Sequence, residues 1–437
     1  MRLPVADFSK MDASIRTLAS IYEHRKVSPR GQAELLWYQY YTQHMQKIRE
    51  AWERGEFILS MFDACPAEIP YAMDLPWYGT VVYGPGAVAV GAKIEEATLD
   101  SARQVGLMLE TCSGWRMTVG MMMRGWYPRP GAVVSGNPTC DTCAKCWPLM
   151  AYLANVPSFF IDVPFPAGNE RNISYVATEL AELIEWLENV SGKKMDWDRL
   201  RETVELGRQM VELNREIQEI LKARPSPIVP RMTTQSYWFN WIYSGTPEGV
   251  HFLTALRDEV KEKAVRGASG LPPVKGEAPV KERFRVISIP PVPQIRGKTL
   301  DWLWREYGVS IVVSTFMLWP DVEMDPDKPL ESIARKYLNN PLIRQYFNPC
   351  ESPYGTVTAT VQAARDYEAN GVMIWGNPSC DATSGFVKIM RDRLAETGVP
   401  SVVFDHDPAD PTYTSEDALK ERMEEFVDLL ESREWEG

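Results

Sequence analysis

The sequence predicts an α/β protein with two related, doubly wound (Rossmann-like) parallel-sheet domains, a helical N-terminal region and long middle helices. Three observations support this fold class. Strand-like apolar runs alternate with helix-length segments, as in parallel sheets. One stretch of the first half recurs in the second half. The chain has 437 residues, 45% of them hydrophobic, which is too long for one ordinary core.

The internal repeat is the most informative feature of the chain. Residues 131–141 read GAVVSGNPTCD, and residues 371–381 read GVMIWGNPSCD. After a helix-sized gap, each copy continues with Val-Pro-Ser and a short apolar run, at 156–162 and 399–405. Chance rarely supplies such a matched continuation together with a shared Gly-Asn-Pro. We infer that the two halves carry related domains.

The first half divides into a helical region and an α/β domain. Apolar residues recur at helical spacing through 10–57, which predicts a helical N-terminal region over 1–56. The first α/β domain is predicted over 57–170. Its elements are strands at 57–62, 132–134 and 159–162, and a helix at 101–123.

A helical segment separates the two α/β domains. Residues 171–282 are predicted to hold two long amphipathic helices within 173–223, followed by a Gly/Pro/Lys-rich linker at 266–283. The second α/β domain is predicted over 283–437. Its strands are expected at 285–289, 310–314, 372–375 and 402–404.

Composition and charge exclude several classes of protein. The net charge of −12 argues against nucleic-acid binding, which needs a basic face. No apolar run reaches the roughly 18–20 residues of a membrane span, and residues 1–16 do not resemble a signal peptide. We therefore expect a cytoplasmic protein without a membrane partner. Cytoplasmic thiols stay reduced, so the seven Cys favour a metal role over disulfides.

Two of the cysteines follow equivalent strands of the repeat. Cys140 and Cys380 each come directly after a strand and a Gly-Asn-Pro turn. Ligands of parallel sheets bind at this edge, so related domains that face one another would bring both thiols to one cleft. Cys112, in the same α/β unit as Cys140, is the natural third ligand. Thiolates are the usual ligands of iron–sulfur clusters, and three of them leave one iron open for Lewis-acid chemistry. We predict a [4Fe–4S] cluster on Cys112, Cys140 and Cys380.

The remaining cysteines leave alternatives open. Cys140, Cys143 and Cys146 form a tight run that zinc could use, although a zinc site needs a fourth ligand and no His lies near a Cys. A structural role for Cys143 and Cys146 is the other interpretation. Cys65 ends the first predicted strand and could reach the same cleft. The role of Cys350 is left open.

Two further residues are candidates for proton transfer. Glu68 follows the first strand closely, and a carboxyl desolvated in an apolar pocket would have a raised pKa. Its structural alternative is a carboxylate that begins a helix. His406 lies at the end of the last strand and is either a proton donor or a loop residue. We predict Glu68 and His406 as catalytic residues.

In this order and spacing, the motifs resemble those of the 2-hydroxyacyl-CoA dehydratase and benzoyl-CoA reductase family, from about residue 50 to 432. The marks are Pro66-x-Glu68-x-x-x-Ala72, Cys112, Cys140-Asp141, Ser379-Cys380, and FDHD at 404–407 leading to RMEEF at 422–426. The long middle helices with ARPSP at 223–227 look most like the larger catalytic subunit of ATP-dependent benzoyl-CoA reductases.

The resemblance implies partners, a substrate class and a reaction. The chain would pair with a smaller, related subunit that carries its own cluster. An ATP-dependent iron–sulfur activator would supply single low-potential electrons. The substrate would be an acyl-CoA, and the enzyme would be oxygen-sensitive and belong to anaerobic metabolism. The leading expectation is a benzoyl-CoA-type reductase that acts on an aromatic acyl-CoA.

Other functions remain open at this point. A subunit of an (R)-2-hydroxyacyl-CoA dehydratase is the alternative within the family. An electron-relay iron–sulfur subunit without substrate contact and a zinc-binding structural protein are alternatives of other classes. A double-cubane branch of the family has further cysteines in its second domain. Residues 312–323, VVSTFMLWPDVE, contain none, although Cys350 stands where that branch also has a cysteine.

Overall fold

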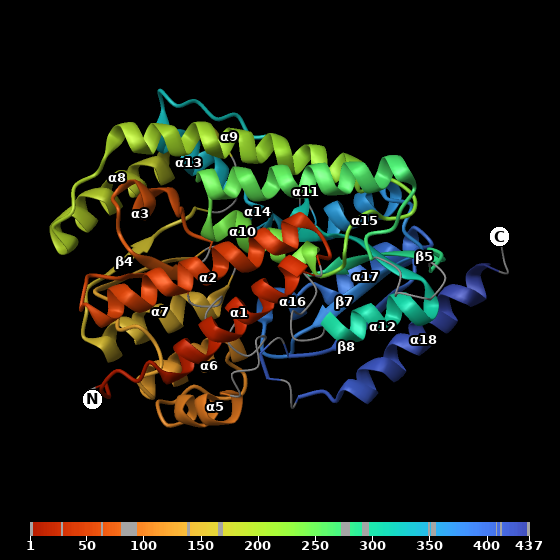
Figure 1. Ribbon diagram of the computed structural model, residues 1–437, viewed down its shortest axis with the longest axis horizontal. Helices are drawn as coiled ribbons and strands as arrows, with labels where there is room; N and C mark the ends of the chain where they lie inside the picture. The colour runs from red at the N-terminus through yellow and green to blue at the C-terminus, as the bar shows by residue number, and fades with distance from the viewer. Residues whose placement is uncertain are drawn as a thin grey trace.

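The protein is built on two separate four-stranded parallel sheets, which confirms the predicted fold class. The computed structural model describes residues 3–27, 29–62, 64–79, 94–137, 140–164, 169–271, 280–290, 297–347, 350, 355–407, 409–410 and 413–434. Figure 1 shows the first sheet and its helices beside the second, with the C-terminal helix at the outer edge of the second.

Both sheets have the same strand order. The first runs β2-β1-β3-β4 and the second runs β6-β5-β7-β8, so each places its second strand beside its first and then adds the third and fourth. This is the order of flavodoxin-like doubly wound folds. The strands of the first sheet are β1 (Leu59–Met61), β2 (Trp77–Gly79), β3 (Ala132–Gly136) and β4 (Ser158–Ile161). Those of the second are β5 (Phe284–Ile289), β6 (Val309–Ser314), β7 (Gly371–Gly376) and β8 (Ser401–Asp405).

Helices connect the strands and extend beyond each sheet. Before and within the first sheet lie α1 (Ser9–Val27), α2 (Gln32–Glu53), α3 (Glu68–Ala72), α5 (Glu95–Arg103), α6 (Ser113–Met123) and α7 (Asp141–Ala154). The middle of the chain forms α8 (Glu170–Ser191), α9 (Trp197–Ile220), α10 (Met232–Ile242) and α11 (Pro247–Arg266). Around the second sheet lie α12 (Gly297–Tyr307), the 3₁₀ turn η2 (Thr315–Met317), α13 (Pro329–Leu338), α14 (Pro341–Phe347), α15 (Thr356–Asp366), α16 (Asp381–Ser384), α17 (Val387–Glu396) and α18 (Glu416–Glu434).

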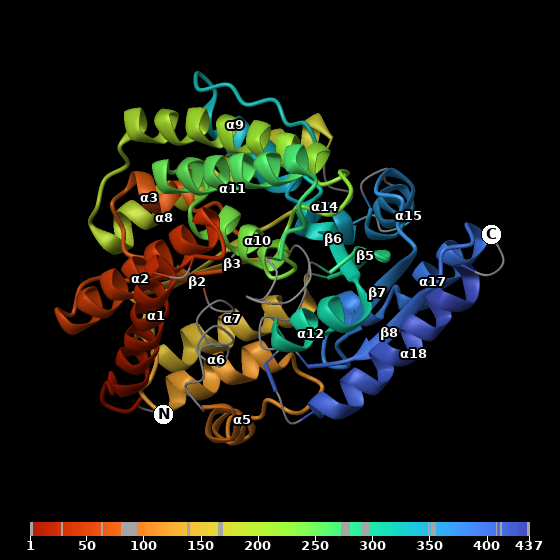
Figure 2. The same ribbon diagram turned by 45° about the vertical axis from the view of Figure 1, so that its right-hand side comes forward.

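The long middle helices begin and end at residues suited to those positions. Asn169 and Asp196 are the N-caps of α8 and α9, and each side chain accepts a hydrogen bond from the backbone N–H three residues later. Helix α11 begins after the N-cap Thr246, with Pro247 in its first turn, and ends at Gly267, whose φ of 63° suits glycine. Figures 1 and 2 show α9 and α11 side by side above the sheets.

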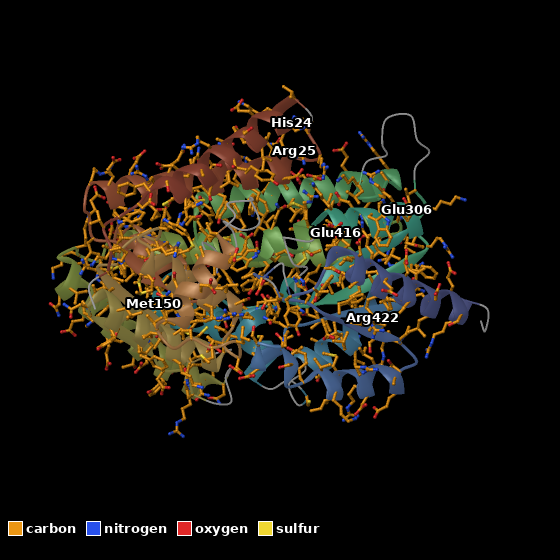
Figure 3. The ribbon with its side chains drawn as sticks, turned by 90° about the horizontal axis from the view of Figure 1, so that it is seen from below. His24, Arg25, Met150, Glu306, Glu416 and Arg422 are labelled. Carbon is orange, nitrogen blue, oxygen red and sulfur yellow. The ribbon has the colours of Figure 1, made fainter. Side chains whose placement is uncertain are left out.

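Burial joins the two halves into one body. The larger cluster of buried apolar side chains includes residues of both sheets and of the middle helices. A second cluster lies between the second sheet and helices α12 and α18. Helix α13, from the second half, packs against α8 and α9. Seen from below in Figure 3, Met150 of α7 lies in one half, and Glu416 and Arg422 of α18 lie in the other.

The predicted helical N-terminal region is confirmed and consists of two helices, α1 and α2. The single helix predicted over 101–123 is wrong, because α5 and α6 are separate helices and the chain turns between them at Gly106, whose φ is 87°. This break matters, because it makes Cys112 the residue that begins α6. Strand β2 was missed, since three residues give too little pattern to recognise. The linker prediction at 266–283 falls partly on 272–279, outside the described residues.

Candidate functional site

The two sheets place Cys140 and Cys380 at equivalent strand ends. Winding reverses between β1 and β3 in the first sheet and between β5 and β7 in the second. Ligands of doubly wound sheets bind beyond the carboxyl ends of the strands at such a switch point. Cys140 follows β3 as the N-cap of α7, and Cys380 follows β7 as the N-cap of α16. Both thiols therefore stand where this kind of sheet binds its ligand.

Cys112 lies close enough to both thiols to interact with their charges. It is the N-cap of α6, which packs against α7. Burial raises the pKa of Cys112 well above its ordinary value, and the neighbouring thiols of Cys380 and Cys140 raise it further. Burial also raises the pKa of Cys380, with Cys140 contributing. The structure thus brings together three cysteines that stand 28 and 240 residues apart (140 − 112 and 380 − 140).

Cys140 differs from the other two thiols in its ionisation. Its pKa is lowered to about 7, chiefly because Cys143 hydrogen-bonds to it, with help from the backbone N–H groups of Cys143 and Thr142. These contacts outweigh the effect of burial. The thiolate is the form that ligates metals, and a helix N-terminus stabilises it. The hydrogen bond from Cys143 therefore favours the thiolate of Cys140, which is about half ionised at neutral pH.

Alkylation of the metal-free protein tests this hydrogen bond. Iodoacetamide labelling of Cys140, followed by peptide mass spectrometry, is expected to reach half its maximal rate near pH 7. Removing the donor with Cys143→Ala should move this midpoint to higher pH, toward the ordinary value of about 8.5. Cys146 is the internal comparison, because burial raises its pKa to about 12. A midpoint that Cys143→Ala leaves unchanged would contradict the proposed donor.

The thiols are not arranged as a site for a single ion. Among the residues that the structure describes, no group of three or more His, Cys, Asp or Glu side chains could hold one metal ion. Cys143 and Cys146, which a zinc site would need, are buried in the larger apolar core. A cluster is larger than an ion, and each of its irons takes its own thiolate, so its ligands stand further apart. Cys112, Cys140 and Cys380 supply the ligand type that such a cluster takes.

Asp407 contacts the helix that Cys112 begins, and the sequence reasoning missed it. It lies two residues beyond β8, and its carboxylate accepts a hydrogen bond from the Ser113 hydroxyl at the start of α6. The backbone N–H groups of Ala409 and Asp410 donate to the same carboxylate at 2.9 and 2.8 Å. Its second oxygen lies 3.9 Å from a guanidinium nitrogen of Arg116. The second half of the chain therefore reaches the residue next to Cys112.

His406 precedes Asp407 and follows β8 directly. Its side chain is buried, its backbone N–H donates to the carbonyl of Gly376 at 2.9 Å, and its ring packs edge to face on Trp375, with 5.7 Å between the ring centroids. A catalytic role for His406 stays a prediction. Its neighbour Asp407 contacts Ser113, the residue that follows Cys112.

Glu68 takes part in a buried ionic network. One of its carboxylate oxygens lies 3.0 Å from Lys336 Nζ and accepts a hydrogen bond from the Ser244 hydroxyl at 2.8 Å, and Lys336 donates to Ser244 at 2.6 Å. Only 2% of Glu68 and 6% of Lys336 is exposed. Gly245, which follows Ser244, has a φ of 65°, and a Cβ at this position would lie 2.9 Å from the Glu68 Cγ. Glycine thus lets this turn pack against the carboxylate.

The direction of the Glu68 pKa shift is opposite to the sequence expectation. Burial alone would raise the pKa of Glu68, but the charge of Lys336 and the hydrogen bonds to the carboxylate outweigh it and lower the pKa. Sequence reasoning considered burial without a partner, because Lys336 is 268 residues away. Glu68 is therefore ionised at neutral pH and can accept a proton rather than donate one.

A small cavity, lined by polar and apolar side chains, connects this network with Cys65. It has a volume of about 20 Å³, enough for roughly one water molecule, and Glu68, Ser244, Lys336, Cys65 and Tyr337 line part of it. The Cys65 sulfur lies 4.0 Å from the Tyr337 hydroxyl. Cys65 is thus a buried residue between β1 and α3, next to this network, whereas Cys350 is exposed.

In the part of the chain that the structure describes, we find no helix that is both long and apolar enough to span a membrane.

Comparison with known proteins connects the chain to a family of enzymes. Residues 64–430 match the family described as 2-hydroxyglutaryl-CoA dehydratase, D-component. The alpha subunit of (R)-phenyllactyl-CoA dehydratase from Clostridium sporogenes is 25% identical, over 87% of this chain and 91% of its own length. A benzoyl-CoA reductase subunit from Thauera aromatica is also 25% identical, over 76% and 79%. The alpha subunit of lactoyl-CoA dehydratase from Anaerotignum propionicum is 24% identical, over 89% and 94%.

Proposed function

Because the chain belongs to the 2-hydroxyglutaryl-CoA dehydratase D-component family, and is therefore an enzyme of that family, we propose that it is an iron–sulfur catalytic subunit that acts on an acyl-CoA. The observation that carries the proposal is the convergence of Cys112, Cys140 and Cys380 from both halves of the chain. These three residues would hold a [4Fe–4S] cluster. When bound, such a cluster supplies single electrons and one iron with an open position for a substrate oxygen.

The surrounding residues support such a ligand set. Each ligand begins a helix, so backbone N–H groups lie near the sulfur and stabilise negative charge. Cys143 donates to Cys140 and favours its thiolate. The three cysteines are only partly exposed, which limits the access of water and favours chemistry on a reactive acyl group. These features are the chain's own contribution to the site.

Glu68 is the proposed proton acceptor. It stands between β1 and the body of α3, at the switch point of the first sheet, and Lys336 holds it ionised. An ionised carboxylate is the form that accepts a proton, and the pairing with Lys336, which lowers its pKa, makes Glu68 a weaker base than an ordinary carboxylate. His406 remains the proposed second proton-transfer residue, and the proposal for it rests on its place at the end of β8.

We propose reduction of an aromatic acyl-CoA, of the benzoyl-CoA type, as the leading reaction. Support comes from the similarity to the benzoyl-CoA reductase subunit. Dehydration of an (R)-2-hydroxyacyl-CoA is the second candidate. It is supported by the phenyllactyl-CoA dehydratase subunit, which is as similar to this chain as the reductase subunit and matches a larger share of it. Because these relatives are themselves named as subunits, we also propose a smaller, cluster-bearing partner subunit. A separate ATP-dependent iron–sulfur activator would deliver the electrons.

Turnover by the native complex separates the reactions. The complex is purified without oxygen, supplied with its activator, ATP and a low-potential reductant, and offered benzoyl-CoA or (R)-phenyllactyl-CoA. We expect benzoyl-CoA to gain two hydrogens by mass spectrometry, and the hydroxyacyl thioester to stay unchanged. Loss of water from the latter with no reduction of the former would replace the leading reaction by the second. If neither thioester reacts or alters the spectrum of the protein, an electron-relay role is indicated and the catalytic proposal is wrong.

A further inference from the structure

We propose that Asp407, Ser113 and Arg116 form an interdomain latch that holds Cys112, from the first half, beside Cys380, from the second. We call these three residues the latch. The inference deepens the proposed function and rests on it for its purpose, since only a ligand shared by both halves requires such alignment. All three are positioning residues, because they act through Cys112.

The contacts of the latch cross between the two halves. Asp407 follows β8 of the second sheet, whereas Ser113 and Arg116 lie in the first turns of α6 beside the first sheet. Ser113 donates to one carboxylate oxygen, and Arg116 approaches the other at 3.9 Å. The side chains of Arg116 and Asp407 are each 3% exposed. Hydrogen bonds to a buried charge are among the stronger ones in proteins, so this contact is well placed to hold the two halves in register.

The latch should affect the position of Cys112 relative to Cys380, but not relative to Cys140. Cys112 precedes Ser113 directly, and the Arg116 backbone N–H donates to the Cys112 carbonyl at 3.0 Å. The position of the Cys112 backbone therefore follows that of α6. Cys140 belongs to the same half as Cys112, and α6 packs directly on α7. Loss of the latch should thus change the distance from Cys112 to Cys380 while the arrangement of Cys112 and Cys140 remains.

A buried donor of Arg116 supports a bound group at this place. Arg116 Nε donates to the carbonyl of Thr111 at 2.8 Å, but its Nη1 is buried and has no hydrogen-bond partner among the described residues. Buried donors are seldom left without an acceptor, so this one calls for an explanation. An acceptor atom of a group bound next to α6 would satisfy it.

Thiol cross-linking of the metal-free protein tests the latch without depending on activity. Dibromobimane bridges two nearby thiols, and peptide mass spectrometry then gives the ratio of Cys112–Cys380 to Cys112–Cys140 bridges. We expect Asp407→Ala to lower this ratio about tenfold, the size that corresponds to about 1.4 kcal/mol. Ser113→Ala and Arg116→Gln should lower it less, and Asp407→Asn, which keeps an acceptor oxygen, least. The matched control is Asp405→Ala, which removes an exposed carboxylate at the end of β8 and should leave the ratio unchanged.

Each outcome decides the inference. A ratio that equals the wild-type value in Asp407→Ala, with a wild-type unfolding transition, overturns the latch. If Asp407→Ala does not fold, Ser113→Ala and Asp407→Asn decide: a lower ratio supports the latch, and an unchanged ratio overturns it. The result is separable from the proposed function. Absence of iron in the wild-type protein would defeat the cluster proposal, while the ratio still decides whether Asp407 aligns the two halves.

Discussion

Replacing Lys336 with methionine is expected to reduce the free energy of unfolding by about 3–5 kcal/mol, the range found when one partner of a buried ion pair is removed. Glu68 and Lys336 are both almost fully buried, and their atoms lie 3.0 Å apart. Without Lys336, Glu68 must either remain as a buried unpaired carboxylate or take up a proton. Both cost stability at neutral pH. Denaturant unfolding of the purified protein measures the loss.

Two controls and the pH dependence identify the cause. The double variant Lys336→Met with Glu68→Gln should recover most of the loss, because no buried charge remains. Lys388→Met removes the partner of Asp392 in a surface ion pair. Because the Lys388 side chain is 85% exposed, this substitution should reduce the free energy of unfolding only slightly. The lowered pKa of Glu68 stabilises the wild type above about pH 4.3, and this contribution fades as pH falls. Lys336→Met raises the pKa of Glu68 instead, so the gap between the two proteins should narrow toward acid pH. A loss no greater than that of Lys388→Met would refute the account of this pair.

Replacing Cys112 with alanine is expected to lower turnover of the complex to below about 1% of wild type, a larger effect than the 10–100-fold losses typical of residues outside the ligand set. Cys112 is one of three proposed ligands, and Cys140 and Cys380 alone would not retain a cluster. Anaerobic assay with the activator measures the effect. Equivalent losses are expected for alanine at Cys140 and at Cys380.

The other cysteines provide matched controls for this prediction. Cys350 is exposed, and Cys350→Ala should keep wild-type turnover. Cys146 is buried in the core at the other end of the tight cysteine run, so Cys146→Ala should cost stability but retain the cluster. If Cys146→Ala abolished turnover and Cys112→Ala did not, the ligand set would have to be redrawn around the tight run.

Much of the fold was predictable because its signals are local. The strands β5, β6 and β7 of the second sheet are rich in apolar residues, and every residue in them is buried. The repeated GNPxCD segment correctly indicated related domains, and both sheets have the same strand order. The break between α5 and α6 at Gly106 was not predicted. Strand β2 was too short to recognise.

The site was only partly predictable, because its decisive contacts are distant in sequence. The repeat and the strand ends suffice to nominate Cys140 and Cys380, and the structure places them near Cys112. The partner of Glu68 is 268 residues away and that of Ser113 is 294 residues away, so no local pattern contains either contact. For the same reason, the direction predicted for the pKa shift of Glu68 was wrong. The FDHD segment at 404–407 contains Asp407, but the prediction from this segment named His406 instead.

Metal analysis of anaerobically purified protein, before and after Cys380→Ala, tests the central claim most directly. Iron, sulfide and zinc are measured together with the electron paramagnetic resonance of the reduced protein. We expect about four irons and four sulfides per wild-type chain, and a reduced-cluster signal that the substitution abolishes or alters. Absence of iron after anaerobic handling and cluster loading, or iron that Cys380→Ala leaves unaffected, would contradict a cluster shared by the two halves. Zinc in its place would favour the run Cys140, Cys143 and Cys146.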